Sequence, residues 1–336
     1  MINQKFFSPS EYLFLPTKNK PRVALAVDDK NISKNSFLLY NPFSLKARLL
    51  KKINYYSLTK ANSISKKILN IHSKESNSSL IEHLEKRLNC SLISSIYFST
   101  TNDKVVIQLQ SIDAKILGYL KYPLSARGEA NIINEKKAIE ILSNNGVVES
   151  YILSNIFDNS TYLLLKSIDG KIDYISCNSL DVILSNFRRN KHYLLHEHPR
   201  IKELQIKTNS IGLKNYSKLI NKICKKSNLK YELVYEHGDF APWNILKVKK
   251  KYVPFDFEYF IENGIEYFDS IKYFYSIGKL VKNKKGRDLL LFLNKNIHLK
   301  EPKEFFSLFL ISEVIRNIAD KVPYNFEVEL IDLLNK

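Results

Sequence analysis

The pattern of apolar and polar positions changes along the chain from a strand-like to a helix-like period. In the first half, apolar residues alternate with polar ones over 94–99, 104–110 and 115–122, and short polar turns separate these runs. Alternation with a period of two places one face of each strand in a core, so the runs predict an antiparallel meander. Two further strands are predicted over 147–153 and 161–165.

The first 75 residues predict smaller elements. The apolar run 22–27 and the stretch 36–40 predict a short strand pair, and a basic helical pattern follows over 43–69. The clustered Lys and Arg residues of that pattern either form a solvated face or dock on an anionic lipid or a glycan carrier. A helix is predicted over Ser79–Leu88, because two serines precede an apolar set at helical spacing.

From about residue 178 onward the apolar positions recur every three to four residues, which is typical of helices. Helices are predicted over 179–189, 216–227, 265–280, 285–293, 304–319 and 327–334. Short extended pieces interrupt them at 231–235, 244–248 and 252–257. The predicted fold class is therefore α+β, with an antiparallel sheet followed by a mainly helical part.

The length of the chain indicates two lobes, because a single core stops growing near roughly 250 to 300 residues and this chain has 336. A hydrophobic content of 44% is ample for a core. We expect an N-terminal extension over 1–75, a sheet lobe over 76–165 and a helical lobe over 166–336.

The net charge of +18 favours acidic surroundings such as nucleotides, phosphorylated acceptors or an anionic membrane face. The excess is spread over both halves and no nucleic-acid motif is present, so specific nucleic-acid binding is not expected. Three cysteines without CxxC spacing indicate a reducing cytoplasm. No apolar run approaches the roughly 18 residues that span a bilayer, and the oligomeric state stays open.

The stretch 237–246, HGDFAPWNIL, carries the candidate chemistry together with 255–258, FDFE. Asp239, on a turn after a strand, could accept the proton of an acceptor hydroxyl that attacks a γ-phosphate. Asn244 and Asp256 offer oxygen ligands for Mg²⁺. Trp243 would help to bury the loop, and His237 is expected to orient its backbone.

A second set of candidates lies in the predicted sheet lobe. Lys121, near the end of a strand, and Glu135, on the following helix, are expected to face each other, as in kinases where such a pair directs the lysine toward the phosphates of the nucleotide. The stretch 166–170, KSIDG, ends an apolar strand and predicts a hinge whose backbone could pair with an adenine edge.

Taken together, these stretches resemble the aminoglycoside phosphotransferase and choline kinase superfamily, which has the bilobal protein-kinase-like fold. HGDFAPWNIL is similar to the catalytic loop of that family and FDFEYF to its metal-binding segment, and Asp269 matches a downstream aspartate. The resemblance covers residues 92–320 and leaves 1–75 outside.

By this resemblance the chain uses ATP, or another nucleoside triphosphate, with Mg²⁺. It also implies particular roles: Asp239 as catalytic base, Asn244 and Asp256 as metal ligands, Lys121 with Glu135 as the phosphate-orienting pair, and the Lys166 carbonyl and Ile168 amide as adenine contacts.

The acceptor is expected to be a hydroxyl of a small molecule or glycan, and two classes stay open. Carboxylates at Glu258, Glu262, Glu266 and Asp269 could line a pocket for an amino alcohol or an aminoglycoside, whereas the net positive charge favours a sugar or a phosphorylated, lipid-linked glycan. The alternative is a catalytically silent nucleotide-binding or scaffold protein of the same fold. It is favoured by the absence of glycine over 99–104, where a Gly-rich loop would approach the phosphates closely.

Overall fold

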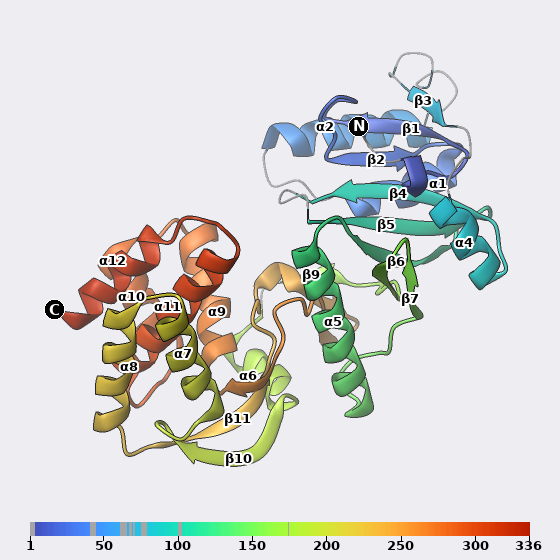
Figure 1. The fold of residues 1–336 in the computed structure, drawn as a ribbon. Coiled ribbons are helices and arrows are strands. Elements are labelled where there is room, and N and C mark those ends of the chain that lie inside the picture. Colours follow the sequence, from blue (N-terminus) through green and yellow to red (C-terminus); the bar gives the residue numbers. More distant parts are fainter. Residues whose placement is uncertain are drawn as a thin grey trace. The chain divides into compact units, whose positions relative to one another are not determined.

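The computed structural model describes residues 4–40, 45–60, 66, 69, 71–74, 79–99, 103–173 and 175–336. The chain divides into two compact units (Figure 1). Unit 1 comprises Met1–Ser143 and Glu149–Ile168, and unit 2 comprises Asn144–Val148 and Asp169–Lys336.

Unit 1 is built on an eight-stranded antiparallel sheet with the strand order β3-β1-β2-β4-β5-β6-β8-β7. The strands are β1 (Ser10–Leu15), β2 (Val23–Ala26), β3 (Ile71–Lys74), β4 (Leu92–Phe98), β5 (Lys104–Ser111), β6 (Ile116–Pro123), β7 (Leu153–Phe157) and β8 (Ser160–Leu165). The predicted meander is confirmed as β4, β5 and β6, which pair in sequence order. The first two strands join the same sheet, because β2 pairs with β4.

The described helices of unit 1 are η1 (Gln4–Phe6), α1 (Lys30–Ser36), η2 (Phe37–Leu39), α2 (Leu45–Lys60), α4 (Ser79–Leu88) and α5 (Ala126–Asn144). All of them except α5 contribute residues to one of two separate apolar clusters. One cluster joins Tyr12 and Phe14 of β1 to Leu84 of α4, and the other joins Leu13 of β1 to Leu58 of α2. Alternate residues of β1 therefore serve opposite faces, which explains why that strand is apolar on both.

Unit 2 is mainly helical and contains two small antiparallel sheets, with the orders β10-β11-β14 and β13-β12-β9. Its strands are β9 (Lys171–Ile172), β10 (Arg188–Leu194), β11 (Lys230–Glu236), β12 (Ile245–Val248), β13 (Lys251–Pro254) and β14 (Ile261–Ile265). Its helices are α6 (Cys177–Ser185), α7 (Pro199–Ser210), α8 (Lys214–Lys226), η3 (Pro242–Asn244), α9 (Phe268–Ser276), η4 (Ile277–Val281), α10 (Gly286–Asn296), α11 (Pro302–Ala319) and α12 (Asn325–Asn335). The predicted fold class, a sheet unit followed by a mainly helical unit, is confirmed.

Three predicted elements are wrong in type or position. Residues 36–39 form the end of α1 and the short helix η2 instead of a strand. Helix α1 begins at a cap in which the Asp29 side chain accepts from two backbone amides. The strand predicted over 147–153 begins only at Leu153 and continues to Phe157. A two-residue turn with positive φ at Asp158 and Asn159 joins it to β8 and sets the pairing of the two strands. The helix predicted over 179–189 ends at Ser185.

Other parts of the prediction lie partly outside the described residues. The basic helix predicted over 43–69 is described as α2, and several residues on either side of it are not described. Three residues of the glycine-free loop, 100–102, are likewise outside the described part of the chain. The predicted boundaries at 75 and 165 stay predictions, and the described strands before residue 75 belong to the sheet of unit 1. Among the described helices, none is both long and apolar enough to cross a membrane.

Candidate functional site

The loop that follows β11 depends on a glycine. Gly238 has a φ of +78°, a left-handed conformation that side chains rarely adopt. A Cβ atom at this position would lie 2.1 Å from the backbone oxygen of Tyr259. The chain can therefore turn sharply here only because the residue is glycine, and the turn brings Asp239 next to helices α9 and α11, whose Lys272 and Arg316 contact it.

Asp269, in the first turn of α9, holds the backbone of this loop. Its carboxylate accepts hydrogen bonds from the His237 amide at 2.7 Å and from the Gly238 amide at 3.1 Å. Burial and the nearby Glu236 carboxylate raise the pKa of Asp269 to about 8, although the two amide donors oppose this shift. Asp269 thus holds the backbone of the loop, and none of its described hydrogen bonds involves the Asp239 carboxylate.

His237 links the loop to the hairpin that follows it. Its Nε2 donates to the backbone oxygen of Phe255 at 3.0 Å, and the ring lies against Phe257 with centroids 4.5 Å apart. Burial lowers the pKa of His237, which keeps the ring neutral near pH 7. The hydrogen bond to Phe255 ties the loop to the hairpin, and the role predicted for His237 in orienting the backbone stays a prediction.

Asn244 fixes one oxygen of Asp239. Its Nδ2 donates to the Asp239 backbone oxygen at 2.8 Å and to Asp239 Oδ2 at 2.9 Å. Both protons of the amide are then used, so the side-chain carbonyl of Asn244 points its lone pairs elsewhere. The preceding Trp243 is half-buried in the short helix η3.

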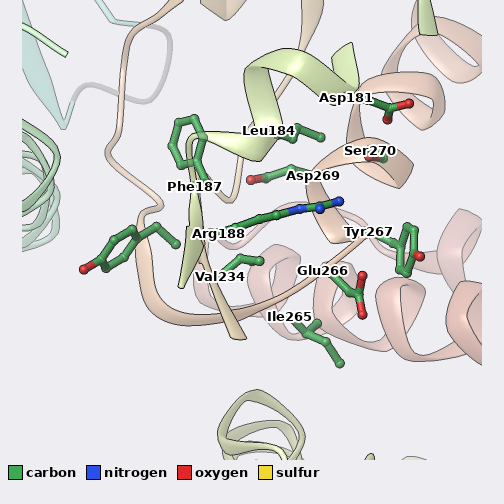
Figure 2. Close-up of a pocket in the computed structure, with 11 residues that line it drawn as sticks. Asp181, Leu184, Phe187, Arg188, Val234, Ile265, Glu266, Tyr267, Asp269 and Ser270 are labelled. Atoms are coloured by element: carbon green, nitrogen blue, oxygen red, sulfur yellow. The ribbon is translucent and has the colours of Figure 1, made fainter. Parts of the chain in front are cut away.

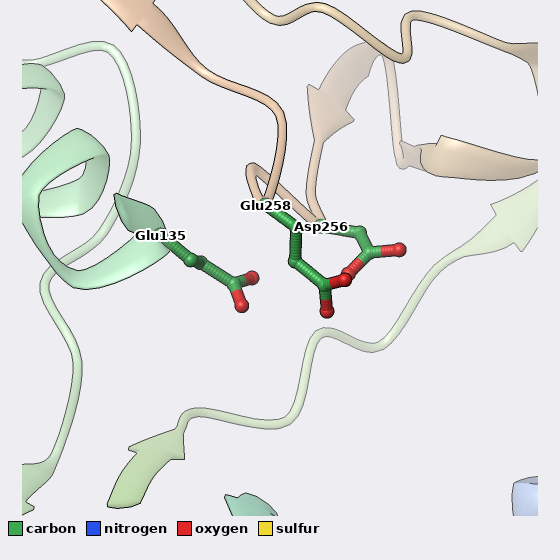
Figure 3. A group of neighbouring side chains, drawn as sticks. All are labelled: Glu135, Asp256 and Glu258. Atoms are coloured by element: carbon green, nitrogen blue, oxygen red, sulfur yellow. The ribbon is translucent and has the colours of Figure 1, made fainter. Parts of the chain in front are cut away.

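The hairpin of β12 and β13 brings the predicted metal ligands to one end. Ile245 pairs with Pro254, and the Phe255 amide donates to the Asn244 backbone oxygen at 3.0 Å. Asp256 comes next, and a carboxylate oxygen of Asp256 lies within 4.8 Å of one of Glu258. Figure 3 shows these two side chains next to each other, and it also draws Glu135 of unit 1. Two carboxylates and an amide carbonyl are the oxygen donors that Mg²⁺ prefers.

Two cations contact Asp239 on the side away from Asn244. Lys272 Nζ of α9 lies 3.3 Å from Asp239 Oδ1, and Arg316 of α11 donates to the same oxygen at 3.2 Å. Burial by itself raises the pKa of Asp239, but Lys272 and Arg316 outweigh burial and hold that pKa below its usual range. Asp239 is therefore ionised at neutral pH.

Glu313 holds both cations in place. Its Oε2 lies 2.8 Å from Lys272 Nζ and 2.6 Å from Arg316 Nη2, and its side chain is buried. Sequence reasoning missed all three of these residues. The available signals were weak: Lys272 follows Asp269 by three residues on one helix face, and Glu313 precedes Arg316 by three on another.

Unit 1 holds the predicted lysine–glutamate pair. Lys121 lies on β6 and Glu135 on α5, and Lys121 Nζ lies 2.7 and 2.9 Å from the two carboxylate oxygens. Both side chains are buried. Lys166 and Ile168 follow β8 outside any helix or strand, and the exposed Lys166 side chain forms an ion pair with Glu149 at 3.2 Å.

A small pocket lies behind the loop in unit 2, with a volume of about 60 Å³ (Figure 2). Asp269 and Glu266 line it, and Figure 2 shows the side chain of Arg188 between them. Asp239 is not among the residues that line this pocket, so Glu266 and Asp269 face a cavity other than the space next to Asp239.

No family model and no curated protein matches the chain. The chain is similar to an ethanolamine kinase from Plasmodium vivax, with 14% identity, 92% of this chain and 95% of that chain covered, and a TM-score of 0.46. It is also similar to a choline kinase from Streptococcus pneumoniae, with 12% identity, 77% and 99% covered, and a TM-score of 0.45. A third match is an aminoglycoside phosphotransferase with bound ADP, with 16% identity, 77% and 97% covered, and a TM-score of 0.44.

These structural neighbours are kinases and phosphotransferases. At such identities and TM-scores, the roles of individual residues rest on the geometry of the loop described above.

Proposed function

We propose that the chain is an ATP- and Mg²⁺-dependent phosphotransferase that moves the γ-phosphate to a hydroxyl of a small molecule or glycan. The observation that carries this proposal is the arrangement around Asp239. A carboxylate kept ionised by two cations and oriented by an amide is suited to receive the proton of an attacking hydroxyl.

The contacts of Asp239 favour one of its oxygens for this task. Arg316 donates to Oδ1, and Lys272 Nζ forms an ion pair with the same oxygen at 3.3 Å, so both cations are directed at Oδ1. Oδ2 accepts one described hydrogen bond, from Asn244, and retains a lone pair. The acceptor hydroxyl would therefore give its proton to Oδ2 as its oxygen bonds to the γ-phosphorus and the nucleoside diphosphate leaves.

Asn244, Asp256 and Glu258 would hold the metal. The amide of Asn244 has both protons committed to Asp239, which leaves its carbonyl for a cation, and the carboxylates of Asp256 and Glu258 supply negative charge. When bound, Mg²⁺ neutralises charge on the phosphates. Lys121, fixed by Glu135, would contact those phosphates, and the Lys166 carbonyl and Ile168 amide would pair with the adenine.

For the acceptor we propose a neutral or anionic compound, such as a sugar or a phosphorylated glycan. Lys272 and Arg316 are in contact with Asp239, and the Glu313 carboxylate beside them is committed to both cations. A cationic amine placed close to the reacting hydroxyl would face like charges at short range. The acidic residues considered for an amine pocket include Glu266 and Asp269, which line the small cavity instead.

The test is a screen for the mass increase of one phosphate on candidate acceptors. The purified chain is incubated with ATP and Mg²⁺ and with sugars, sugar phosphates, amino alcohols or aminoglycosides, in parallel with a reaction containing a chelator. Transfer to a sugar or sugar phosphate supports the proposal, and transfer only to amines reverses the choice of acceptor. Nucleotide binding without transfer to any member of the panel would favour the silent scaffold.

A further inference from the structure

Helix α2 carries large apolar side chains on its exposed face. Leu49, Ile53 and Tyr56 are 60%, 55% and 51% exposed, and their spacing of four and three residues aligns them along one side of the helix. Leu50 lies beside them and is 41% exposed. A contiguous apolar stripe of this kind on a surface helix indicates an interaction site more often than scattered single residues do.

The buried face of α2 carries few large apolar side chains. Asn54 and Thr59 are buried there, and each donates its side-chain hydrogen bond to a backbone oxygen one turn earlier, at 2.8 and 2.7 Å. Leu58 is buried in the core of unit 1, and the half-buried Tyr55 packs against the same cluster. The helix thus exposes more large apolar side chains than it buries, which is the reverse of an ordinary surface helix.

The charge of α2 narrows the choice of partner. The helix contains five Lys and Arg residues and no Asp or Glu. Lys46, Lys52 and Lys60 are exposed and flank the apolar stripe. A second copy of the helix would bring like charges together, and a nucleic acid would leave the apolar side chains unused. An anionic lipid surface accepts both groups, because apolar side chains enter the acyl boundary while lysines reach the headgroups.

We propose that the exposed face of α2 docks unit 1 on an anionic lipid bilayer. Leu49, Ile53 and Tyr56 insert at the boundary between headgroups and acyl chains, and the long stems of the flanking lysines lie along the surface with their ammonium groups at lipid phosphates. This proposal is independent of the phosphotransferase activity, since α2 contains none of the residues assigned to it.

Vesicle co-sedimentation of the full chain tests the proposal. Vesicles of phosphatidylcholine alone are compared with vesicles that also contain phosphatidylglycerol. We expect binding to the anionic vesicles, a loss of roughly tenfold or more for the double variant Leu49→Gln/Ile53→Gln, and a smaller loss for Lys46→Gln/Lys52→Gln. The matched control is Val182→Gln/Leu291→Gln, which changes two side chains of unit 2 that are each 67% exposed and should bind like the unchanged chain.

Three results would overturn the proposal. One is equal binding to both kinds of vesicle, and another is anionic binding that the Leu49→Gln/Ile53→Gln variant retains in full, which indicates adsorption by charge alone. The third is a lower molecular mass of that variant in light scattering without lipid, which identifies the stripe as a contact between copies of the chain. Because all these side chains are exposed, circular dichroism should show an unchanged fold.

Discussion

Helix α9 and the short helix η4 that continues it carry two lysines, seven residues apart, that each pair with a glutamate. Lys272 pairs with Glu313 of α11 at 2.8 Å, and Lys279 pairs with Glu327 of α12 at 2.5 Å. Both glutamates are buried, and both pairs join the same helical segment to a later helix. The two ends of the segment differ in what else the lysine contacts.

The near end contacts the candidate site, whereas the far end contacts the helical core. Lys272 reaches Asp239, and Glu313 also holds Arg316. Lys279 instead lies 3.0 Å from the Tyr275 hydroxyl, which donates to Glu327. The same chemical pair can therefore stabilise packing in one place and help to depress the pKa of the proposed base, Asp239, in the other. Substitutions at the two ends should separate these roles.

The largest effect is expected from Asp239→Asn, which removes the group that distinguishes the near end. An amide cannot take the proton of the acceptor hydroxyl, so kcat should fall by about 10² to 10⁴. Turnover is measured by phosphate transfer to the acceptor found in the screen. Thermal unfolding should show a folded protein, and a variant with full activity would contradict the assignment of the base.

Exchange of each lysine for methionine should give opposite results at the two ends. Lys279→Met leaves Glu327 buried without its cation and should cost about 3 kcal/mol of unfolding free energy. Its activity and pH profile should stay unchanged. Lys272→Met leaves Glu313 paired with Arg316 and should cost less stability, while kcat falls roughly tenfold through the loss of one charge contact with Asp239.

The pH profile provides the decisive readout for this comparison. Lys272 helps to depress the pKa of Asp239, so its removal raises that pKa and moves the acidic limb of the kcat profile to higher pH. The Lys279→Met variant serves as the control. If both variants or neither moved the acidic limb, the difference between the two ends would be refuted.

Asp269→Asn tests the hydrogen bonds that hold the loop at the near end and should lower the unfolding free energy by about 2 kcal/mol. Both carboxyl oxygens of Asp269 can accept from the His237 and Gly238 amides in either protonation state, whereas the NH2 group of asparagine cannot accept. The pKa of Asp269 is raised to about 8 in the folded chain, against about 3.9 when unfolded. Its contribution to stability is then fully present below the unfolded pKa and is lost as the pH rises through about 8.

Denaturant unfolding at several pH values checks this sign. The free-energy difference between the original chain and Asp269→Asn should narrow as the pH rises from 4 to 8. A difference that widens over this range would mean that Asp269 is ionised in the folded state at lower pH than its surroundings indicate.

The smallest effect is expected from Tyr275→Phe at the far end. It removes the hydroxyl that donates to Glu327, while Lys279 continues to pair with that carboxylate. The unfolding free energy should fall by about 1.5 kcal/mol, as for the loss of one hydrogen bond to a charged group. The kcat and its pH dependence should stay unchanged. A change in kcat would indicate that the far end also influences the site.

The elements with strong local signals could be predicted from the sequence. The helix Ser79–Leu88 has a regular apolar spacing, and the strands of the meander alternate clearly; both are present as predicted. Strand β10 was missed because its residues, RRNKHYL, are mostly charged or polar, and it forms by pairing with β11. Its position is a consequence of tertiary pairing, which overrides local propensity.

The candidate site divides in the same way. Asp239, Asn244 and Asp256 lie within 18 residues, so a local pattern could identify them. Lys272, Glu313 and Arg316 are separated from Asp239 by 33 to 77 residues, and helical spacing alone does not indicate which of many charged residues meet. Only the packing of α9 and α11 brings them to the loop.

The pairing of β2 with β4 has a practical consequence for shortened forms of the protein. Val23 and Ala24 of β2 pair with Tyr97 and Ile96 along one edge of β4. A chain that begins at residue 76, where the family resemblance would suggest a boundary, would leave β4 as an uncovered strand with free amide and carbonyl groups. Such strands pair readily with other molecules, so the shortened chain should aggregate at concentrations at which the full chain stays dispersed.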